Sequence, residues 1–295
     1  MDKILNFGSI NYDRVYHVHN FVEPGETIPV TDFAIGFGGK GFNQSTAIAR
    51  AGGAVTHVGV VGPDGDPLVD FIRAEGVTAA IERSDQPTGH AVIEVNRDGE
   101  NRILIAAGAN HRFDERHVAE ALQHPPCWVL LQNETNAVAH IVTEAKRAGH
   151  RVAINTAPAT PELRTLDFPS IDLLIANTHE LRTITELDDI DAGIDALRRL
   201  NPDMQIVVTL GAEGSIHDAA GERTRCPAVR NVRAVDTTGA GDTFVGYFIV
   251  ALIEGRSARE RLAFAAAAAA LCVQQHGAVA SVPARAAVEA LLQNP

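Results

Sequence analysis

The sequence predicts an α/β fold: a doubly wound, mainly parallel sheet flanked by helices, with a small β-sheet lid. Short apolar runs alternate with amphipathic segments along most of the 295 residues, which indicates repeated βα units. Two stretches, residues 12–37 and 89–107, break this alternation because they have β character and no intervening helix. The C-terminal third has the pattern of three helices. We therefore expect a single domain over residues 1–295 whose lid is built from two separate segments.

The main sheet should begin with a strand at 3–9, followed by a helix at 43–51 that Gly52 and Gly53 stop. The next strand is expected at 55–61. A helix at 137–148 is closed by Gly149. The other strands are expected at 128–132, 152–155, 173–176 and 206–210. Such alternation favours parallel pairing of the strands.

The two β-rich segments allow two interpretations. They can pair as a small sheet beside the main domain, where they would cover an active site, or they can form edge hairpins of the main sheet. The second segment contains a turn at Asn96-Arg97-Asp98-Gly99, and Asp-Gly suits a tight hairpin. The sequence alone leaves both interpretations open.

Three helices are expected at 239–253, 258–273 and 284–292. Ser281 and Pro283 stand where a cap and a first-turn proline would open the last one. The alanine-rich run at 262–273 is too short to span a bilayer, which needs about 20 residues. A buried helix packed closely against its neighbours accounts for it better.

Charge and cysteine content exclude several classes of protein. A formal net charge of −12 without a basic stripe argues against nucleic-acid binding. The three cysteines, Cys127, Cys226 and Cys272, have no zinc spacing, and buried reduced thiols are expected. Residues 1–9 enter a strand-like run with no signal-type features, so we expect a cytoplasmic protein that does not contact membranes.

The sharpest motif is Asp236-Thr-Thr-Gly-Ala-Gly-Asp-Thr243, in which three small residues precede an acid at the start of an apolar helix. Small residues let a phosphate approach the amides of a helix's first turn. A carboxylate there would repel the phosphate, unless it accepts a proton from a hydroxyl that attacks it. Asp242 is thus a candidate catalytic base. A favourable helix-start acid is the simpler alternative.

A second glycine cluster, Gly36-Phe-Gly-Gly-Lys-Gly41, is followed by Phe42 and Asn43. It contains GxGxxG, but it does not close the first strand, and no acid follows the next strand to hold a ribose hydroxyl. It is not a P-loop, because Lys40 is followed by glycine. A glycine loop before Asn43 can instead hold a polyhydroxylated ligand.

Two further sites follow predicted strands. Asn11 and Asp13 come after the first strand, where open α/β sheets bind ligands, although an ordinary turn explains them too. Asn177 and Glu180 follow the strand at 173–176. They can organise water bound to Mg²⁺, or simply cap the helix that starts there.

In this order, the motifs resemble the ribokinase-like (PfkB) carbohydrate kinase family over nearly the whole chain. The two specific signatures are Gly38-Gly-Lys-Gly-Phe-Asn-Gln44 and Asp236-Thr-Thr-Gly-Ala-Gly-Asp242. Secondary matches are Gln132-Asn-Glu134, Asn155-Thr-Ala-Pro158, Asn177–Glu180, Thr209-Leu-Gly211 and Gly277-Ala-Val-Ala-Ser-Val-Pro283. The resemblance implies a doubly wound domain with a β lid, and a homodimer formed through that lid.

The resemblance also implies roles for individual residues. With Asp242 as base, the sugar would be surrounded by Asn11, Asp13, Gly39, Lys40, Asn43 and Glu134. The anion hole would consist of Gly239, Ala240 and Gly241. Asn177 and Glu180 would interact with Mg²⁺ and with the phosphates of ATP. The nucleotide would be bordered by Thr209, Gly211 and Gly214, with Gly241 beside its phosphates. A potassium ion would be held by Asp236, Thr238, Cys272, Gln275, Gly277 and Ser281.

The implied reaction is transfer of the γ-phosphoryl group of ATP to the primary hydroxyl of D-ribose, which gives ribose 5-phosphate. Phe42 departs from the family pattern, which has a small residue there, so its ring can narrow the pocket or pack under the helix. Deoxyribose, a ketohexose or a nucleoside are alternative substrates. A non-catalytic sugar or nucleotide sensor is the alternative from a different class, and a nicotinamide-dependent oxidoreductase is more distant.

Overall fold

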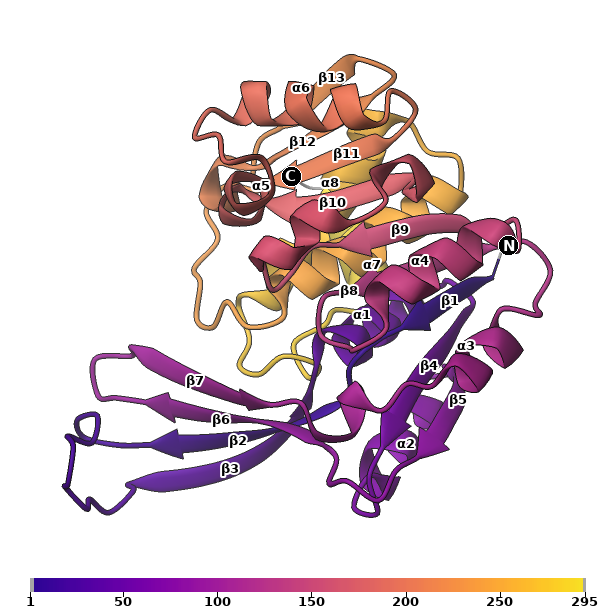
Figure 1. The fold of residues 1–295 in the computed structure, drawn as a ribbon. Coiled ribbons are helices and arrows are strands. Elements are labelled where there is room, and N and C mark those ends of the chain that lie inside the picture. Colours follow the sequence, from indigo (N-terminus) through magenta and orange to yellow (C-terminus); the bar gives the residue numbers. More distant parts are fainter. Residues whose placement is uncertain (1–2, 294–295) are drawn as a thin grey trace.

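The computed structural model describes residues 3–293, which form two sheets with helices around the larger one (Figure 1). Within these residues the main sheet has nine strands, in the order β13-β12-β11-β10-β9-β8-β1-β4-β5. All neighbours pair in parallel except β11 with β12 and β12 with β13, which are antiparallel. The predicted doubly wound, mainly parallel α/β fold is confirmed.

The strands of the main sheet are short and almost wholly buried in its centre. Their bounds are β1 Ile4–Phe7, β4 Val55–Val61, β5 Thr78–Arg83, β8 Trp128–Gln132, β9 Arg151–Asn155, β10 Leu173–Asn177, β11 Gln205–Thr209, β12 Ser215–Ala219 and β13 Glu222–Cys226. Successive residues face opposite sides, so Ile4 and Leu130 join one apolar core while Leu5 and Leu131 join the other. A sheet buried on both faces explains the near-continuous apolar runs in the sequence.

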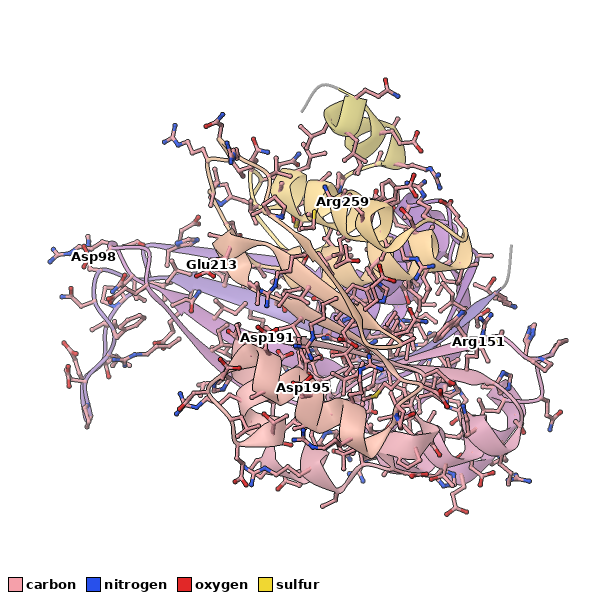
Figure 2. The ribbon with its side chains drawn as sticks, turned by 90° about the horizontal axis from the view of Figure 1, so that it is seen from above. Asp98, Arg151, Asp191, Asp195, Glu213 and Arg259 are labelled. Carbon is pink, nitrogen blue, oxygen red and sulfur yellow. The ribbon has the colours of Figure 1, made fainter. Side chains whose placement is uncertain are left out.

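Helices cover both faces of this sheet. Five pack on one face: α1 Lys40–Arg50, α2 Asp66–Ala74, α7 Ala240–Ile253, α8 Ala258–Cys272 and α9 Arg285–Gln293. The other face is covered by α3 Glu115–Ala121, α4 Val138–Arg147, α5 Thr178–Thr185 and α6 Ile190–Leu200. From above, α6 with Asp191 and Asp195 lies on one side of the sheet, and α8 with Arg259 lies on the other (Figure 2). None of the helices within residues 3–293 combines the length and hydropathy needed to cross a membrane.

The two β-rich segments form a separate sheet that projects from the body of the molecule (Figure 1). Its strands are β2 Asn11–His17, β3 Asp32–Gly38, β6 Gly89–Val95 and β7 Asn101–Ala106, in the order β3-β2-β6-β7. The predicted hairpin turn joins β6 to β7, and Asp98 lies at the far end of the sheet (Figure 2). The structure therefore decides between the two interpretations in favour of a separate sheet, which we call the lid.

Several sequence predictions need correction. The helix expected at 43–51 begins three residues earlier, so Lys40 lies in its first turn and not in a loop. Ser281 does not cap the last helix, which begins at Arg285; its hydroxyl donates to Ala278 O instead. Cys226 is partly exposed, whereas Cys127 and Cys272 are buried as expected. The predictions also missed six helices and strands of the main domain, namely α2, β5, α3, α6, β12 and β13.

Candidate active site

The start of α7 lies between two neighbouring pockets. One is apolar, with a volume of about 490 Å³, and the other is polar, with a volume of about 210 Å³. Gly241, Thr209 and Thr237 line both of them, so the pockets share a wall. Gly239 precedes the helix in the left-handed conformation, at φ +77°. The first-turn amides of α7, which lack intrahelical acceptors, are therefore placed where the two pockets meet.

Asp242 lines the polar pocket and is buried. Its Oδ2 accepts a hydrogen bond from Asn43 Nδ2 at 3.0 Å, and its Oδ1 accepts one from Gln44 Nε2 at 2.8 Å. Both donors belong to α1, which the first glycine cluster opens. The two glycine motifs, about 200 residues apart in the sequence, thus meet at this carboxylate.

Lys40 lines the same pocket and lies among carboxylates. Burial by itself would lower its pKa, but the charges of Asp242, Glu134 and Glu180 raise the pKa above its ordinary value. Glu134 Oε2 accepts from the backbone N–H of Lys40 at 3.0 Å and also from the Ser9 hydroxyl. A fully charged ammonium is therefore held beside the carboxylate of Asp242.

Asn11 and Asp13 lie on β2, at the base of the lid, and do not line the polar pocket. Asn11 Oδ1 accepts from Asn110 Nδ2 at 2.7 Å. Burial, together with the charges of Glu134 and Asp242, raises the pKa of Asp13 to about 6. A Cβ at Gly38 would lie 2.2 Å from an Asp13 oxygen, so glycine is required there to make room for the carboxylate.

Asn177 and Glu180 line the polar pocket and also cap α5. Asn177 Oδ1 accepts from Glu180 N at 2.8 Å, and Glu180 Oε2 accepts from Asn177 N at 3.0 Å, which is a complete capping box. Burial raises the pKa of Glu180, and the hydrogen bonds from Asn177 and Thr156 only partly oppose it. The capping interpretation is thus confirmed, and the pair still faces the pocket.

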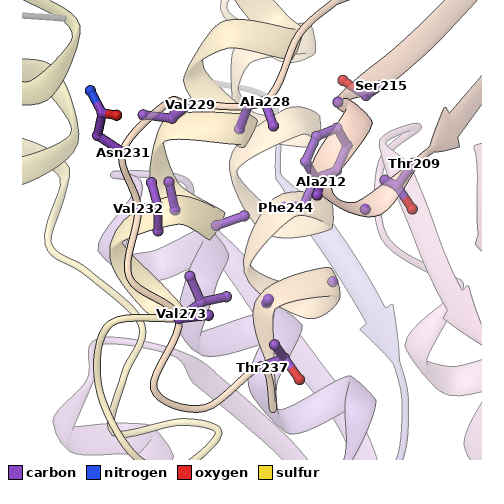
Figure 3. Close-up of a pocket in the computed structure, with 18 residues that line it drawn as sticks. Thr209, Ala212, Ser215, Ala228, Val229, Asn231, Val232, Thr237, Phe244 and Val273 are labelled. Carbon is purple, nitrogen blue, oxygen red and sulfur yellow. The ribbon is translucent and has the colours of Figure 1, made fainter.

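The apolar pocket is formed by the loop after β11, the segment after β13, and helices α7 and α8 (Figure 3). Thr209, Gly211 and Gly214, the residues expected to border a nucleotide, line this pocket. Sequence reasoning missed most of its walls, which include Ala228, Val229, Val232, Phe244, Ala269 and Val273. These are small or branched apolar side chains whose pattern is that of ordinary core residues.

The six positions assigned to a potassium ion gather beside α7. Asp236 accepts from Thr238 N and Gly277 N, both at 2.9 Å. Although burial opposes ionisation, these hydrogen bonds hold the pKa of Asp236 below its ordinary value. Cys272 Sγ lies 3.0 Å from Ser281 Oγ and 3.8 Å from Thr238 O. Two loops, 236–238 and 272–281, are thereby held together.

Comparison with known proteins identifies the family to which this chain belongs. The profile described as pfkB family carbohydrate kinase matches residues 1–285. The chain belongs to the PfkB family. A ribokinase of Haemophilus influenzae is 36% identical over 294 residues, which cover 94% of each chain. The PfkB family assignment makes this protein a carbohydrate kinase.

Solved structures agree with the PfkB assignment. A ribokinase from Thermotoga maritima superposes with a TM-score of 0.90 at 33% identity, and each chain is covered completely. A ribokinase of Arabidopsis thaliana, complexed with ribose and ATP, superposes with a TM-score of 0.86 at 32% identity, over 99% of each chain.

Phe42, the departure from the PfkB pattern, does not enter the pocket. It is 0% exposed and packs in an aromatic cluster with Phe37 and Phe71, at centroid distances of 6.4 and 5.7 Å. Of the two possibilities open from the sequence, packing under the helix is the one observed.

We expect Phe42→Ala to destabilise the protein by about 3–5 kcal/mol, because it empties a fully buried site. Preference among sugars should stay within about twofold of the wild type, since the ring does not line the pocket. Urea unfolding and a sugar panel measure the two effects. Leu200→Ala, at a residue 52% exposed, is the control and should change stability by less than about 0.5 kcal/mol. A changed sugar preference at normal stability would contradict this assignment.

Proposed function

We propose that this PfkB kinase transfers the γ-phosphoryl group of ATP to the primary hydroxyl of D-ribose. The observation that carries the proposal is the start of α7, which stands between an apolar pocket of nucleotide size and a polar pocket containing Asp242. A donor phosphate at this helix start would lie beside the carboxylate. The Haemophilus influenzae and Thermotoga maritima relatives named as ribokinases support ribose as the acceptor.

In the proposed reaction, Asp242 accepts the proton of the attacking hydroxyl. The hydroxyl oxygen forms a bond to the γ-phosphorus while the bond from that phosphorus to the bridging oxygen of ADP breaks. Gly239, Ala240 and Gly241 form the anion hole, where first-turn amides stabilise the charge on the transferring group. Lys40, which is charged and lines the polar pocket, adds positive charge next to the transferring group.

The sugar is proposed to bind between the polar pocket and the base of the lid. Its hydroxyls would contact the side chains of Asn11, Asp13, Lys40, Asn43 and Glu134, with Gly39 at close approach. Gly39 has φ +92°, and a Cβ there would lie 2.9 Å from Ser9 O. Glycine is therefore needed to bring the chain into this position.

The nucleotide is proposed to fill the apolar pocket, with Thr209, Gly211 and Gly214 at its border and its phosphates directed to Gly241. The Arabidopsis thaliana relative, whose structure is complexed with ribose and ATP, supports ATP as the nucleotide. Asn177 and Glu180 fit a magnesium ion held through water, because both Glu180 oxygens already accept hydrogen bonds from the protein. When bound, Mg²⁺ neutralises phosphate charge.

A potassium ion is proposed at Asp236, Thr238, Cys272, Gln275, Gly277 and Ser281. The low pKa of Asp236 keeps a negative charge available, and backbone carbonyls of the two loops would supply the other ligands. The loop 236–238 leads directly into Gly239, so an ion there would support the anion hole. We propose the cytoplasm as the location, because its reducing conditions suit the free thiols of Cys226 and Cys272.

The lid is proposed to close over the sugar and to join two copies of the chain. Large apolar side chains are exposed on its strands, namely Phe33, Ile35, Ile103, Leu104 and Ile105. These residues lie on β3 and β7, the two edge strands of the lid, and exposed apolar side chains of this size indicate an interaction surface. Closure would exclude water and limit hydrolysis of ATP.

The experiment that tests the function is ADP release by the purified protein with Mg-ATP and a panel of acceptors. The panel contains D-ribose, 2-deoxyribose, a ketohexose and a nucleoside, each with and without potassium. We expect the highest kcat/KM with D-ribose and a higher rate with potassium. Turnover with another acceptor alone would replace ribose but keep the mechanism. Binding without turnover for the whole panel would favour a sensor.

Sugar affinity should weaken in acid because of Asp13. Its pKa of about 6 means that the carboxylate is ionised above that pH and protonated below it. An ionised carboxylate accepts hydrogen bonds from two sugar hydroxyls, whereas the protonated form loses part of this capacity. We expect the Kd for ribose to rise as the pH falls below 6, by at most about tenfold per pH unit, and to level off at the Kd of the protonated form.

Calorimetric titrations with ribose between pH 5 and 8 measure this dependence. The control is Asp13→Asn, which cannot titrate and should give a weak Kd that is independent of pH in this range. An unchanged Kd for the wild type from pH 8 to 5 would remove Asp13 from the sugar site.

A further inference from the structure

Gln44 is a buried amide that holds the catalytic carboxylate, and no role was assigned to it from the sequence. It follows Asn43 in α1 and is 0% exposed. Its Nε2 donates to Asp242 Oδ1 at 2.8 Å and to Asn155 Oδ1 at 3.0 Å. Its Oε1 accepts from Gln132 Nε2 at 2.8 Å. All polar atoms of this side chain are therefore engaged.

The amide cannot turn over without losing these contacts. Gln132 Nε2 also donates to Asn6 Oδ1 at 2.8 Å, while Asn6 Nδ2 donates to Gly41 O and to Ser45 Oγ, both at 2.8 Å. A flipped Gln44 would set its oxygen against the oxygens of Asp242 and Asn155, and its amide N–H groups against that of Gln132. A chain of buried side chains thus fixes which atom of Gln44 faces the carboxylate.

The far end of the chain is a neutral histidine. Ser45 Oγ lies 2.9 Å from His57 Nδ1, and burial lowers the pKa of His57 to about 4. Ser45 Oγ accepts from Asn6 Nδ2 and forms its other hydrogen bond with Nδ1 of the neutral ring. Gln132 Nε2 donates both to Asn6 and to Gln44, and the branch through Gln44 ends on Asp242 with an N–H group.

The two donors to Asp242 differ in what a sugar would do to them. Asn43 Nδ2 bonds Oδ2 and belongs to the proposed sugar site, so its contact is shared with or given up to the substrate. Gln44 is 0% exposed and has every polar atom of its amide bonded within the protein, whereas Asn43 is 5% exposed and its Oδ1 has no partner in the protein, so Gln44 is the donor that keeps Oδ1 in place. Oδ2 is then the oxygen left to accept the proton.

We propose that Gln44 is a positioning residue that holds Oδ1 of Asp242, so that Oδ2 faces the reacting hydroxyl, and that Gln132 and Asn6 keep it in this orientation. The proposal rests on the assignment of Asp242 as the base. A hydrogen bond to the charged form of a carboxylate favours that form. Loss of Gln44 therefore changes both the orientation of the Asp242 carboxylate and the pH range in which this carboxylate acts as the base.

The test is the pH–rate profile of Gln44→Met, with Ser45→Ala as a control for loosening of the same network. We expect Gln44→Met to lower kcat about 10- to 100-fold and to leave both KM values within about threefold. The acidic limb of its kcat profile should move about one unit to higher pH. Gln132→Met should act in the same direction with a smaller effect. Ser45→Ala should reduce Tm but keep the wild-type kcat and acidic limb.

Each outcome decides the question. If folded Gln44→Met has the wild-type kcat and the wild-type acidic limb, the proposal is overturned. It is also overturned if Ser45→Ala shifts the acidic limb of the kcat profile as far as Gln44→Met does. If Gln44→Met does not fold, Gln132→Met carries the test, since it leaves Asp242 and both of its donors present. Near-normal turnover of Asp242→Asn would instead refute the base on which the proposal rests, so the two failures are distinguishable.

Discussion

Asp242→Asn is expected to lower kcat by about 10²- to 10⁴-fold, the range that a positioned general base contributes. The asparagine has the same shape but cannot take the hydroxyl proton. Its amide also meets donors from both Asn43 and Gln44, so only one of those hydrogen bonds can be kept. Sugar affinity should fall much less than kcat, because the other polar groups of the sugar site are unchanged.

The measurement is kcat and KM at saturating Mg-ATP, together with calorimetric binding of the sugar. Asp98→Asn removes the same charge at an exposed position at the tip of the lid and should behave as wild type (Figure 2). If Asp242→Asn kept more than about a tenth of the wild-type kcat, general base catalysis by this residue would be refuted.

The second large effect is expected for Gly239→Ala, which should lower kcat about 100-fold or more, as for loss of an anion-hole donor. Gly239 has φ +77°, where an alanine is strained, and its Cβ would meet Ala278 O at 3.0 Å. The turn must shift to relieve this contact, and the shift would displace the first-turn amides of α7 from the phosphate.

Gly255→Ala is the matched control for this substitution. Gly255 follows the other end of α7 with φ +75°, and a Cβ there would meet nothing within 4 Å. Both variants should lose about 1–2 kcal/mol of unfolding free energy from the strained conformation. Only Gly239→Ala should lose kcat, and equal kcat values for the two variants would show that the position of these amides is not critical.

Much of the fold was predictable because alternating apolar and amphipathic segments have few physical solutions. The strands expected at 55–61 and 128–132 have those bounds in the structure. The lid was predictable as β structure, but its separation from the main sheet was not. That separation depends on β2 pairing in parallel with β6, which is about 80 residues away, and no local pattern encodes such a partner.

The candidate site was predictable where glycine and polar residues stand together. Asn43 and Asp242 were both singled out from their motifs, and the structure places them 3.0 Å apart. Gln44 was missed because a glutamine on a helix is most often at the surface. Its signal was the run Asn43-Gln-Ser-Thr46 on a helix buried along most of its length. Buried polar groups need partners, so such a run indicates a network.

The start of α1 was misplaced for a related reason. Glycines favour a loop, yet Gly41 lies inside the helix. Glycine is needed at this position because a Cβ there would be 2.4 Å from Gly8 Cα. Close packing of α1 on the segment after β1 thus outweighs the low helix propensity of glycine. Ser281 failed as a cap because its hydroxyl is used by the loop that holds Cys272.

The most direct test of the account is identification of the phosphorylated product by ³¹P NMR after incubation with Mg-ATP and D-ribose. The account predicts ADP and one new phosphomonoester whose phosphorus couples to the methylene protons of carbon 5. The same signal should be absent when Asp242→Asn is incubated for the same time. ADP and inorganic phosphate without a new phosphomonoester, or a phosphate on another ribose carbon, would contradict a kinase that presents the primary hydroxyl to Asp242.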